Sequence, residues 1–270
     1  MCMIVYDEGW SMDMQRYIVP PEAFRGRTVV VEGDDAFHLS RVMRMRPGDR
    51  IVVCDGCGRE ATAVLTKVAP DRAEAEAEDF RPSAGEPAWT VVIAQSLPKG
   101  DKMELIIQKG TEIGAAAFVP FRSERVIVRY DGKQEAKRLE RWRRIAKEAA
   151  EQAHRGRLPE VSGVASWREL LASFPEYDDV YFCYERQGGE PSAGLRTLVR
   201  ETMSRIPDRP LKLLVVVGPE GGFTEREAAE AEAAGARPVG LGSRILRTET
   251  AALAVLACLM YESGEMGGDG

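Results

Sequence analysis

Three apolar runs of strand length constrain the fold of this chain more than any other feature. They are TVVIAQSL (90–97), DDVYFCYE (178–185) and LKLLVVVG (211–218), and none alternates apolar with polar residues across its centre. Continuous runs of this kind are typical of parallel strands that are covered on both faces. Helical patterns lie between the runs, so we expect an α/β domain built on a parallel sheet.

Two helices can be placed by their patterns. The first is expected to start at Asp101, with Glu104 three residues on as in a capping box, and to end near Gly114. The second follows from apolar residues at helical spacing between Leu139 and Ala153.

The first part of the chain has a different rhythm. From residue 15 to about 78, short β-like segments alternate with turn-rich pieces such as RPGD and DGCG. The stretch 73–78 contains good helix formers, but its strict alternation predicts a strand with one small, buried face. The segment FRPSAGEPAW (80–89) carries two prolines and a glycine, and we take it as the linker. We therefore expect a small β domain over residues 14–80 and the α/β domain over residues 90–270.

Composition excludes several classes of protein. The chain contains no apolar run of eighteen residues, and Asp7 and Glu8 interrupt its start, so we expect neither a membrane span nor a signal peptide but a cytoplasmic protein. Five scattered cysteines indicate reduced thiols. The single C-x-x-C, Cys54 to Cys57, favours a hairpin turn over zinc or redox chemistry, and no metal site is expected.

Charge is unevenly distributed along the chain. The formal net charge is −6, yet the segment 121–157 contains twelve Lys or Arg and six acidic residues. Such a segment suits phosphate binding, because neutralising phosphates releases condensed counterions. A solvated helix face with alternating charges would give the same pattern.

The sharpest local motif follows the third apolar run. A buried strand is expected to end at Val217, and the turn GPEGG (218–222) leads to Thr224, which can cap a helix with Glu227 closing a capping box. Ligands of α/β proteins bind at the carboxyl ends of strands. The turn is neither G-x-G-x-x-G nor a phosphate loop, which disfavours nicotinamide and triphosphate cofactors. A purely structural strand-to-helix turn is equally compatible with the spacing.

A second polar loop follows closely. A short strand is expected to stop at Leu241 and Gly242, and an apolar helix to begin near Thr250. The loop between them carries Arg244, Arg247, Thr248 and Glu249. Charged groups crowded before a buried helix need partners or a ligand.

The two loops belong to a longer resemblance. The segment GPEGGFTEREAAEAEAAGARPVGLGSRILRTETA (218–251) resembles the C-terminal signature of the RsmE family, knotted SPOUT methyltransferases that modify small-subunit ribosomal RNA at uridine N3. Three segments are similar to its central motifs, and HLSRVMRMRPGD (38–49) is similar to its PUA-like RNA-binding domain. The central segments are PKGDKMELIIQKGTEIGA (98–115), VPFRSERVIVR (119–129) and IAKEAAEQAHRGRLPEV (145–161). The chain departs from the family at Gly110, Ala115 and Ala153.

The resemblance implies a fold, a cofactor and partners. The fold is a SPOUT α/β trefoil-knot domain over residues 90–270, preceded by a small PUA-like, RNA-binding β-barrel domain over residues 14–80. The cofactor is S-adenosylmethionine, the substrate is 16S ribosomal RNA within the small ribosomal subunit, and the protein is a homodimer. The thirteen residues before Met14 look surplus to the family pattern, and we expect them to be dispensable for folding and methylation.

The resemblance also implies site residues. Arg247 is the first candidate to stabilise the uridine anion, with Arg122 behind it, and Glu249 is expected to orient Arg247 or act as base. His38 and His154 are not favoured as bases. Cofactor-binding residues are Gly218, Pro219, Glu220, Gly221, Gly222, Leu241, Gly242, Ile245, Leu246 and Arg247, and RNA-binding residues are Arg16, His38, Arg41, Arg44, Lys99, Lys102, Arg125 and Arg155.

Two other functions stay open on the sequence. A knotted methyltransferase could act on tRNA or on a ribose hydroxyl, and a non-catalytic assembly factor could use the same RNA-binding surface. The second predicts no binding of S-adenosylmethionine.

Overall fold

The computed structural model describes residues 14–128, 130–184 and 193–266, and the chain divides into two compact units. The first unit extends to Gly85 and also includes His154–Arg157, and the second contains Glu86–Ala153 and the chain from Leu158 onward. The boundary falls inside the proline-containing segment 80–89. No feature of the sequence predicts that His154–Arg157 belong to the first unit. The leader, residues 1–13, lies outside the described residues.

A mostly antiparallel sheet forms the first unit. Its strands pair in the order β1-β4-β5-β6-β3-β2, with β7 beside β5, and β1 runs parallel to β4. Among the described residues this path has two ends, so strand pairing does not close the expected barrel. The elements are β1 (Arg16–Ile18), η1 (Pro21–Ala23), β2 (Phe24–Arg25), β3 (Thr28–Glu32), α1 (Gly33–Phe37), η2 (His38–Val42), β4 (Arg50–Cys54), β5 (Arg59–Val68), β6 (Arg72–Ala77) and β7 (Arg81–Pro82).

Strand alternation decides which side chains of this sheet are buried. In β6, the alanines at 73, 75 and 77 are buried, whereas Glu74 and Glu76 between them are not. The interpretation of 73–78 as a strand is therefore confirmed, because only a period of two places every second residue on one face.

The C-x-x-C segment is a hairpin turn between β4 and β5. The Asp55 carboxylate accepts hydrogen bonds from the backbone N–H of Cys57 at 2.8 Å and of Arg59 at 3.0 Å. Cys54 is buried, Cys57 is exposed, and both are free thiols. The hairpin interpretation is confirmed, because the carboxylate satisfies the N–H groups of the turn.

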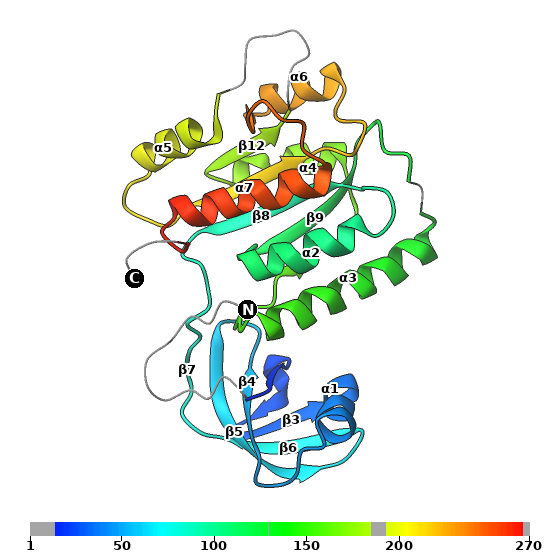
Figure 1. The fold of residues 1–270 in the computed structure, drawn as a ribbon, viewed down its shortest axis with the longest axis vertical. Helices are drawn as coiled ribbons and strands as arrows, with labels where there is room; N and C mark the ends of the chain where they lie inside the picture. The colour runs from blue at the N-terminus through cyan, green and yellow to red at the C-terminus, as the bar shows by residue number, and fades with distance from the viewer. Residues whose placement is uncertain (1–13, 129, 185–192, 267–270) are drawn as a thin grey trace. The chain divides into compact units, whose positions relative to one another are not determined.

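A parallel sheet forms the centre of the second unit, as the apolar runs predict (Figure 1). Its order is β10-β9-β8-β13-β12-β14, with β11 beside β9. The elements are β8 (Thr90–Ser96), α2 (Lys102–Ile113), β9 (Ala117–Arg122), α3 (Gly132–Gln152), β10 (Glu160–Val161), β11 (Ala165–Ser166), α4 (Trp167–Ser173), η3 (Phe174–Glu176), β12 (Asp179–Cys183), α5 (Leu195–Arg205), β13 (Lys212–Val217), α6 (Glu225–Ala233), β14 (Arg237–Pro238) and α7 (Thr248–Glu262).

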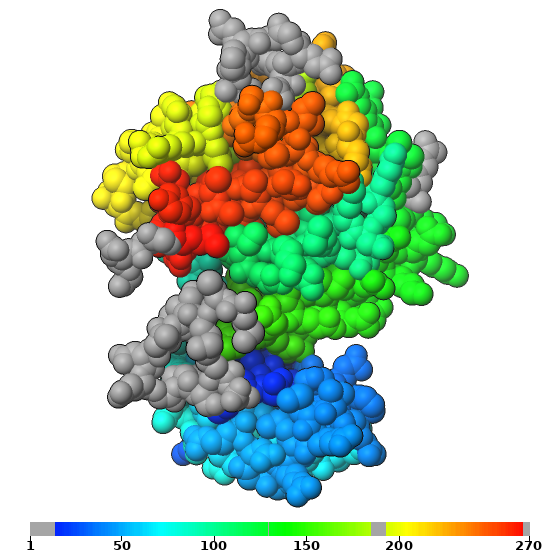
Figure 2. Space-filling view, in the orientation of Figure 1, coloured from blue at the N-terminus to red at the C-terminus, as the bar shows by residue number. Residues whose placement is uncertain are grey.

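Helices cover both faces of this sheet. Val215 of β13 packs in one core with α2, α3, α5 and α7, while its neighbours Leu214 and Val216 pack in another with α4 and α6. Figure 2 shows α2 and α7 side by side on the surface of this unit. The strands therefore have two apolar faces, which explains why their sequences do not alternate.

Within the described residues, no helix is both long and apolar enough to cross a membrane.

The structure corrects three details of the expected helices and strands. Helix α2 starts after Asp101, but the Asp101 side chain does not cap it, and Glu104 pairs with Arg141 instead, so that capping box was wrong. Strand β14 ends at Pro238, not at Gly242, although the Val239 N–H still donates to the Phe182 carbonyl of β12 at 2.9 Å. Helix α7 begins at Thr248, two residues before the expected start. The capping box of Thr224 and Glu227 on α6 is confirmed.

Gly110, one of the departures from the family pattern, has a packing role. A Cβ atom at this position of α2 would lie 2.7 Å from Cε1 of the buried Phe118 ring. Helix propensity alone predicts that Gly110→Ala stabilises the protein by up to about 1 kcal/mol. Because overpacking a core costs about 1–3 kcal/mol, we expect this variant to lower the free energy of unfolding instead.

The control for this substitution is Gly132→Ala. Gly132 opens α3, and a Cβ there would meet no atom within 4 Å. Urea denaturation of both variants checks the expectation, which fails if Gly110→Ala is as stable as Gly132→Ala.

Candidate active site

A buried hydrogen-bond network joins three segments at the carboxyl end of the parallel sheet. Gln95, fully buried at the end of β8, donates from Nε2 to Thr248 Oγ1 at 2.8 Å and to the Gly218 carbonyl at 3.3 Å. Thr248 Oγ1 in turn donates to the same carbonyl at 2.6 Å. Gly218 opens the GPEGG loop, and Thr248 is the first residue of α7, directly after the second loop. The network therefore holds together the ends of the two loops that the sequence singled out.

Further hydrogen bonds attach the loop after β9 to the same region. The Glu227 carboxylate accepts from the N–H of Thr224 at 2.9 Å and from the N–H of Glu124 at 2.7 Å. Arg125 donates a hydrogen bond from Nη1 to the Gly221 carbonyl at 2.9 Å. The capping box of α6 thus also fixes the β9–α3 loop beside the GPEGG loop.

An ion-pair cluster lies at the same two loops. The Lys102 ammonium lies 2.8 Å from Glu220 Oε1 and 3.4 Å from Glu249 Oε2. The hydrogen bond that the Lys102 ammonium donates to the Glu220 carboxylate raises the pKa of Lys102. The backbone N–H of Lys99 also donates to Glu220, at 3.1 Å. Glu220 belongs to the first loop and Glu249 to the first turn of α7, so one cation bridges both sides of the region.

The loops leave space and an unsatisfied acceptor for a ligand. Gly222 and Gly242 have φ angles of +65° and +92°, and a Cβ on either would meet no atom within 4 Å. Among the described residues, the buried Gln95 Oε1 has no hydrogen-bond donor, and the buried Glu249 Oε2 has the Lys102 ammonium at 3.4 Å. Ile245 is 96% exposed. A buried acceptor without a donor is costly, so it fits a ligand that brings its own N–H groups.

The candidate catalytic residues have different environments. Arg247 is exposed at the N-cap of α7, and its side chain forms no ion pair with the residues that the structure describes. Glu249 pairs with Lys102, whereas Arg122, at the end of β9, pairs with Glu135. Of the two candidate arginines, Arg122 is therefore paired with a carboxylate of the described chain and Arg247 is not.

Two of the expected RNA-binding residues are buried. The Arg16 side chain is 7% exposed and pairs with Glu60 at 2.6 Å, and Arg155 is 4% exposed. Burial argues against direct phosphate contacts by either arginine. Arg41 and Arg44 are exposed, and His38 Nδ1 lies 3.0 Å from the Tyr17 hydroxyl. An RNA surface that joins both units stays a prediction.

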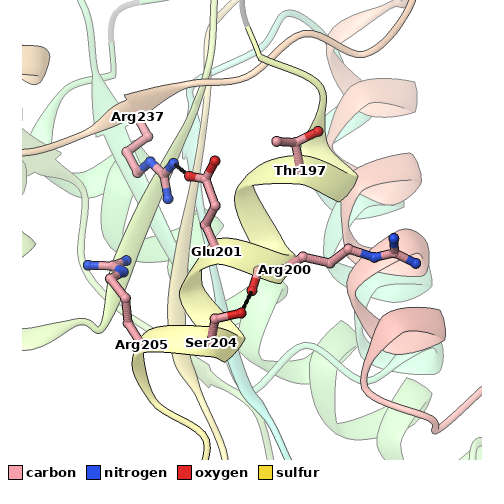
Figure 3. Close-up of a pocket in the computed structure, with 6 residues that line it drawn as sticks. All are labelled: Thr197, Arg200, Glu201, Ser204, Arg205 and Arg237. Carbon is pink, nitrogen blue, oxygen red and sulfur yellow. Dashed lines mark hydrogen bonds and ion pairs between the residues drawn. The ribbon is translucent and has the colours of Figure 1, made fainter.

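A separate hollow of the second unit is occupied by a structural ion network (Figure 3). It lies along α5, where Arg237 pairs with Glu201 (Figure 3). Buried Asp179 accepts from Arg205 at 2.8 Å, from Arg237 at 3.0 Å and from Thr202 at 2.6 Å. Two of the arginines at this hollow are therefore already paired with carboxylates.

In the parts of the chain that the structure describes, no group of three His, Cys, Asp or Glu is arranged to hold a metal ion.

The sequence did not reveal Gln95 and Thr248 as site residues, or the two ion pairs of Lys102. A signal does exist in the pattern. Gln95 and Ser96 are polar residues that end an apolar strand, and Thr248 opens an apolar helix. All three are buried, and a buried polar group at the carboxyl end of a parallel strand needs a specific partner.

Fold and site together define a class of protein. Residues 85–260 match the RNA methyltransferase domain family, and residues 31–78 match the PUA domain family of RNA methyltransferases. A protein from Bacillus subtilis (strain 168) named ribosomal RNA small subunit methyltransferase E is 40% identical over 261 residues, which cover 95% of this chain and 100% of that protein. The chain therefore belongs to the ribosomal RNA small subunit methyltransferase E (RsmE) family, and the resemblance seen in the sequence is confirmed.

Solved structures agree with this assignment. The Neisseria gonorrhoeae ribosomal RNA small subunit methyltransferase E bound to S-adenosyl methionine has a TM-score of 0.78 and 36% identity, covering 92% of this chain and 98% of that chain. A Legionella pneumophila methyltransferase in complex with the same cofactor has a TM-score of 0.80 and 27% identity, covering 93% and 98%.

The buried network gives a prediction about stability. Thr248→Val removes the hydroxyl that bridges the Gln95 amide and the Gly218 carbonyl at nearly constant volume. Leaving buried partners unsatisfied costs about 1–3 kcal/mol, so we expect the free energy of unfolding to fall by that amount. Chemical denaturation without ligand measures it.

Thr250→Val is the matched control, because Thr250 is an exposed residue of the same helix. We expect it to change stability by no more than about 0.5 kcal/mol. Equal stability of the two variants would show that the network contributes little.

Proposed function

We propose that this protein transfers a methyl group from S-adenosylmethionine to N3 of a uridine in 16S ribosomal RNA. The observation that carries the proposal is the buried contact of Gln95 and Thr248 with the Gly218 carbonyl. It joins the ends of two loops at the carboxyl end of a parallel sheet, where ligands of α/β proteins bind. The cofactor named for two structural relatives supports the choice of ligand.

The residues of the two loops fit this cofactor. S-adenosylmethionine carries an ammonium group and an adenine amino group, which can donate to a buried acceptor such as Gln95 Oε1. The exposed Ile245 offers an apolar surface for the adenine ring. We propose that the cofactor is held by Gly218, Pro219, Glu220, Gly221 and Gly222 from one loop and by Leu241, Gly242, Ile245, Leu246 and Arg247 from the other.

We also propose that the C-terminal segment is threaded into a trefoil knot. The first residue of α7 is hydrogen-bonded to the ends of both β8 and β13, strands that lie next to each other in the sheet. A thread at this position would keep α7 and its preceding loop in place during turnover, although threading is rare among folds.

The bound cofactor supplies an electrophilic methyl carbon on a sulfonium, and the protein must align the uridine and manage its charge. As the N3 proton passes to a general base, for which Glu249 is the candidate, negative charge develops on O2 and O4 of the uracil ring. The exposed guanidinium of Arg247 can donate to one of these oxygens, which stabilises the anion as an oxyanion hole does. Arg122 would first have to leave Glu135, so it ranks behind Arg247.

The substrate and the setting follow from this chemistry. Base pairing in a duplex uses the N3 position of uridine, so the target uridine must be unpaired or flipped out of the helix. The PUA domain and exposed residues such as Arg41, Arg44 and Lys99 would hold the surrounding RNA. We propose that the protein acts as a homodimer on the small ribosomal subunit, in the cytoplasm.

Two measurements test the function. Calorimetric titration should show binding of S-adenosylmethionine, and its absence would favour a non-catalytic assembly factor. Mass spectrometry of nucleosides from 16S ribosomal RNA should show N3-methyluridine in cells with this gene and none in cells without it. Methylation of tRNA or of a ribose hydroxyl instead would refute the assigned substrate.

The charge-stabilising role of Arg247 has its own test. We expect Arg247→Ala to lower kcat by about 100-fold or more, which is the usual effect of removing one donor to a developing oxyanion. Because the guanidinium acts on the transition state, affinity for RNA should change little. Single-turnover methylation and RNA-binding assays check both expectations.

Arg168→Ala serves as control, because Arg168 is an exposed arginine on α4 and belongs to neither loop. It should keep the activity of the unmodified protein. Near-normal turnover of Arg247→Ala would eliminate the proposed role.

A further inference from the structure

Lys102 occupies an unusual position for a residue expected to bind RNA. It is the first residue of α2, and its side chain is 26% exposed. Its ammonium lies 2.8 Å from a Glu220 oxygen and 3.4 Å from a Glu249 oxygen. Glu220 belongs to the GPEGG loop and Glu249 to the first turn of α7, directly after the second loop. One side chain therefore links three segments that are far apart in the sequence.

The positive charge of Lys102 keeps two negatively charged carboxylates of the site close to each other. The Glu220 and Glu249 side chains are 30% and 14% exposed, and both carboxylates lie within 3.4 Å of the same nitrogen. If that nitrogen were removed, two carboxylates only a few ångströms apart would repel each other in a region partly shielded from water. We expect the GPEGG loop and the start of α7 to move apart as a result.

The same contacts make Lys102 a poor phosphate ligand. A phosphate would have to compete with two carboxylates that already hold the ammonium. Lys99, three residues earlier, is exposed, and only its backbone N–H has a recorded contact with Glu220. The Lys99 side chain is the better candidate for RNA in this segment.

We propose that Lys102 is a positioning residue of the cofactor site, which sets the spacing of the two loops, and not an RNA contact. The inference rests on the proposed function, because it assumes that the two loops bind S-adenosylmethionine. It assigns to Lys102 an effect on cofactor affinity in the absence of RNA.

The test compares Lys102→Met with Lys109→Met. Lys109 is a lysine of the same helix that pairs with Glu112, one turn away, and belongs to neither loop. We expect Lys102→Met to weaken S-adenosylmethionine binding, measured by calorimetry without RNA, by about tenfold or more. Affinity for RNA and its dependence on salt should match those of Lys109→Met.

Two results would overturn the inference. One is an unchanged cofactor affinity in Lys102→Met. The other is a salt dependence of RNA binding that falls by about one unit of slope, which is the signature of a lost phosphate contact. If the unmodified protein itself fails to bind S-adenosylmethionine, the proposed function falls first, so the two failures can be told apart.

A double-mutant cycle separates positioning from a general loss of structure. Glu249→Gln removes one of the two like charges, so the variant carrying both Lys102→Met and Glu249→Gln should bind the cofactor more tightly than Lys102→Met alone. Simple addition of the two effects would count against the inference. Lys102→Arg keeps the charge and should stay within about threefold of normal affinity, and it carries the test if Lys102→Met does not fold.

Discussion

The Gly218 carbonyl, which accepts hydrogen bonds from the Thr248 hydroxyl and the Gln95 amide, is the contact on which the site depends. All three residues are buried. Leaving such groups unsatisfied costs about 1–3 kcal/mol. The ends of β8 and β13 and the start of α7 therefore cannot separate without a substantial loss of stability, and the two loops stay next to each other.

A weaker set of contacts then adjusts the loops. Ion pairs near the surface contribute about 0–1 kcal/mol to stability, so the pairs of Lys102 add little to folding compared with the buried network. Their value is geometric, because a single ammonium fixes the distance between carboxylates of two loops. Arg125 and Glu227 act similarly on the third loop through backbone groups. Arg247, exposed at the N-cap of α7, has no carboxylate partner among the residues that the structure describes.

Burial also separates the arginines by role. Arg16 and Arg155 carry the same charge as Arg41 and Arg44, but the first two are buried and the second two are exposed. Arg16 is held by Glu60, a residue 44 positions away, and nothing near Arg16 in the sequence indicates that partner. A charged residue in an RNA-binding domain is thus either part of its core or part of its surface, and only long-range contacts decide which.

The sequence by itself determined the parallel sheet, the strand in 73–78, the capping box of Thr224 and Glu227, and the family, because these depend on local periodicity and on ordered motifs. It also singled out the two loops. Only the tertiary structure decided that Gln95 and Thr248 join them, that Lys102 faces carboxylates, and that Gly110 is required by the Phe118 ring. The physical reason is that these contacts join residues that lie from 8 to 153 positions apart. Their strength comes from burial, which no local pattern specifies.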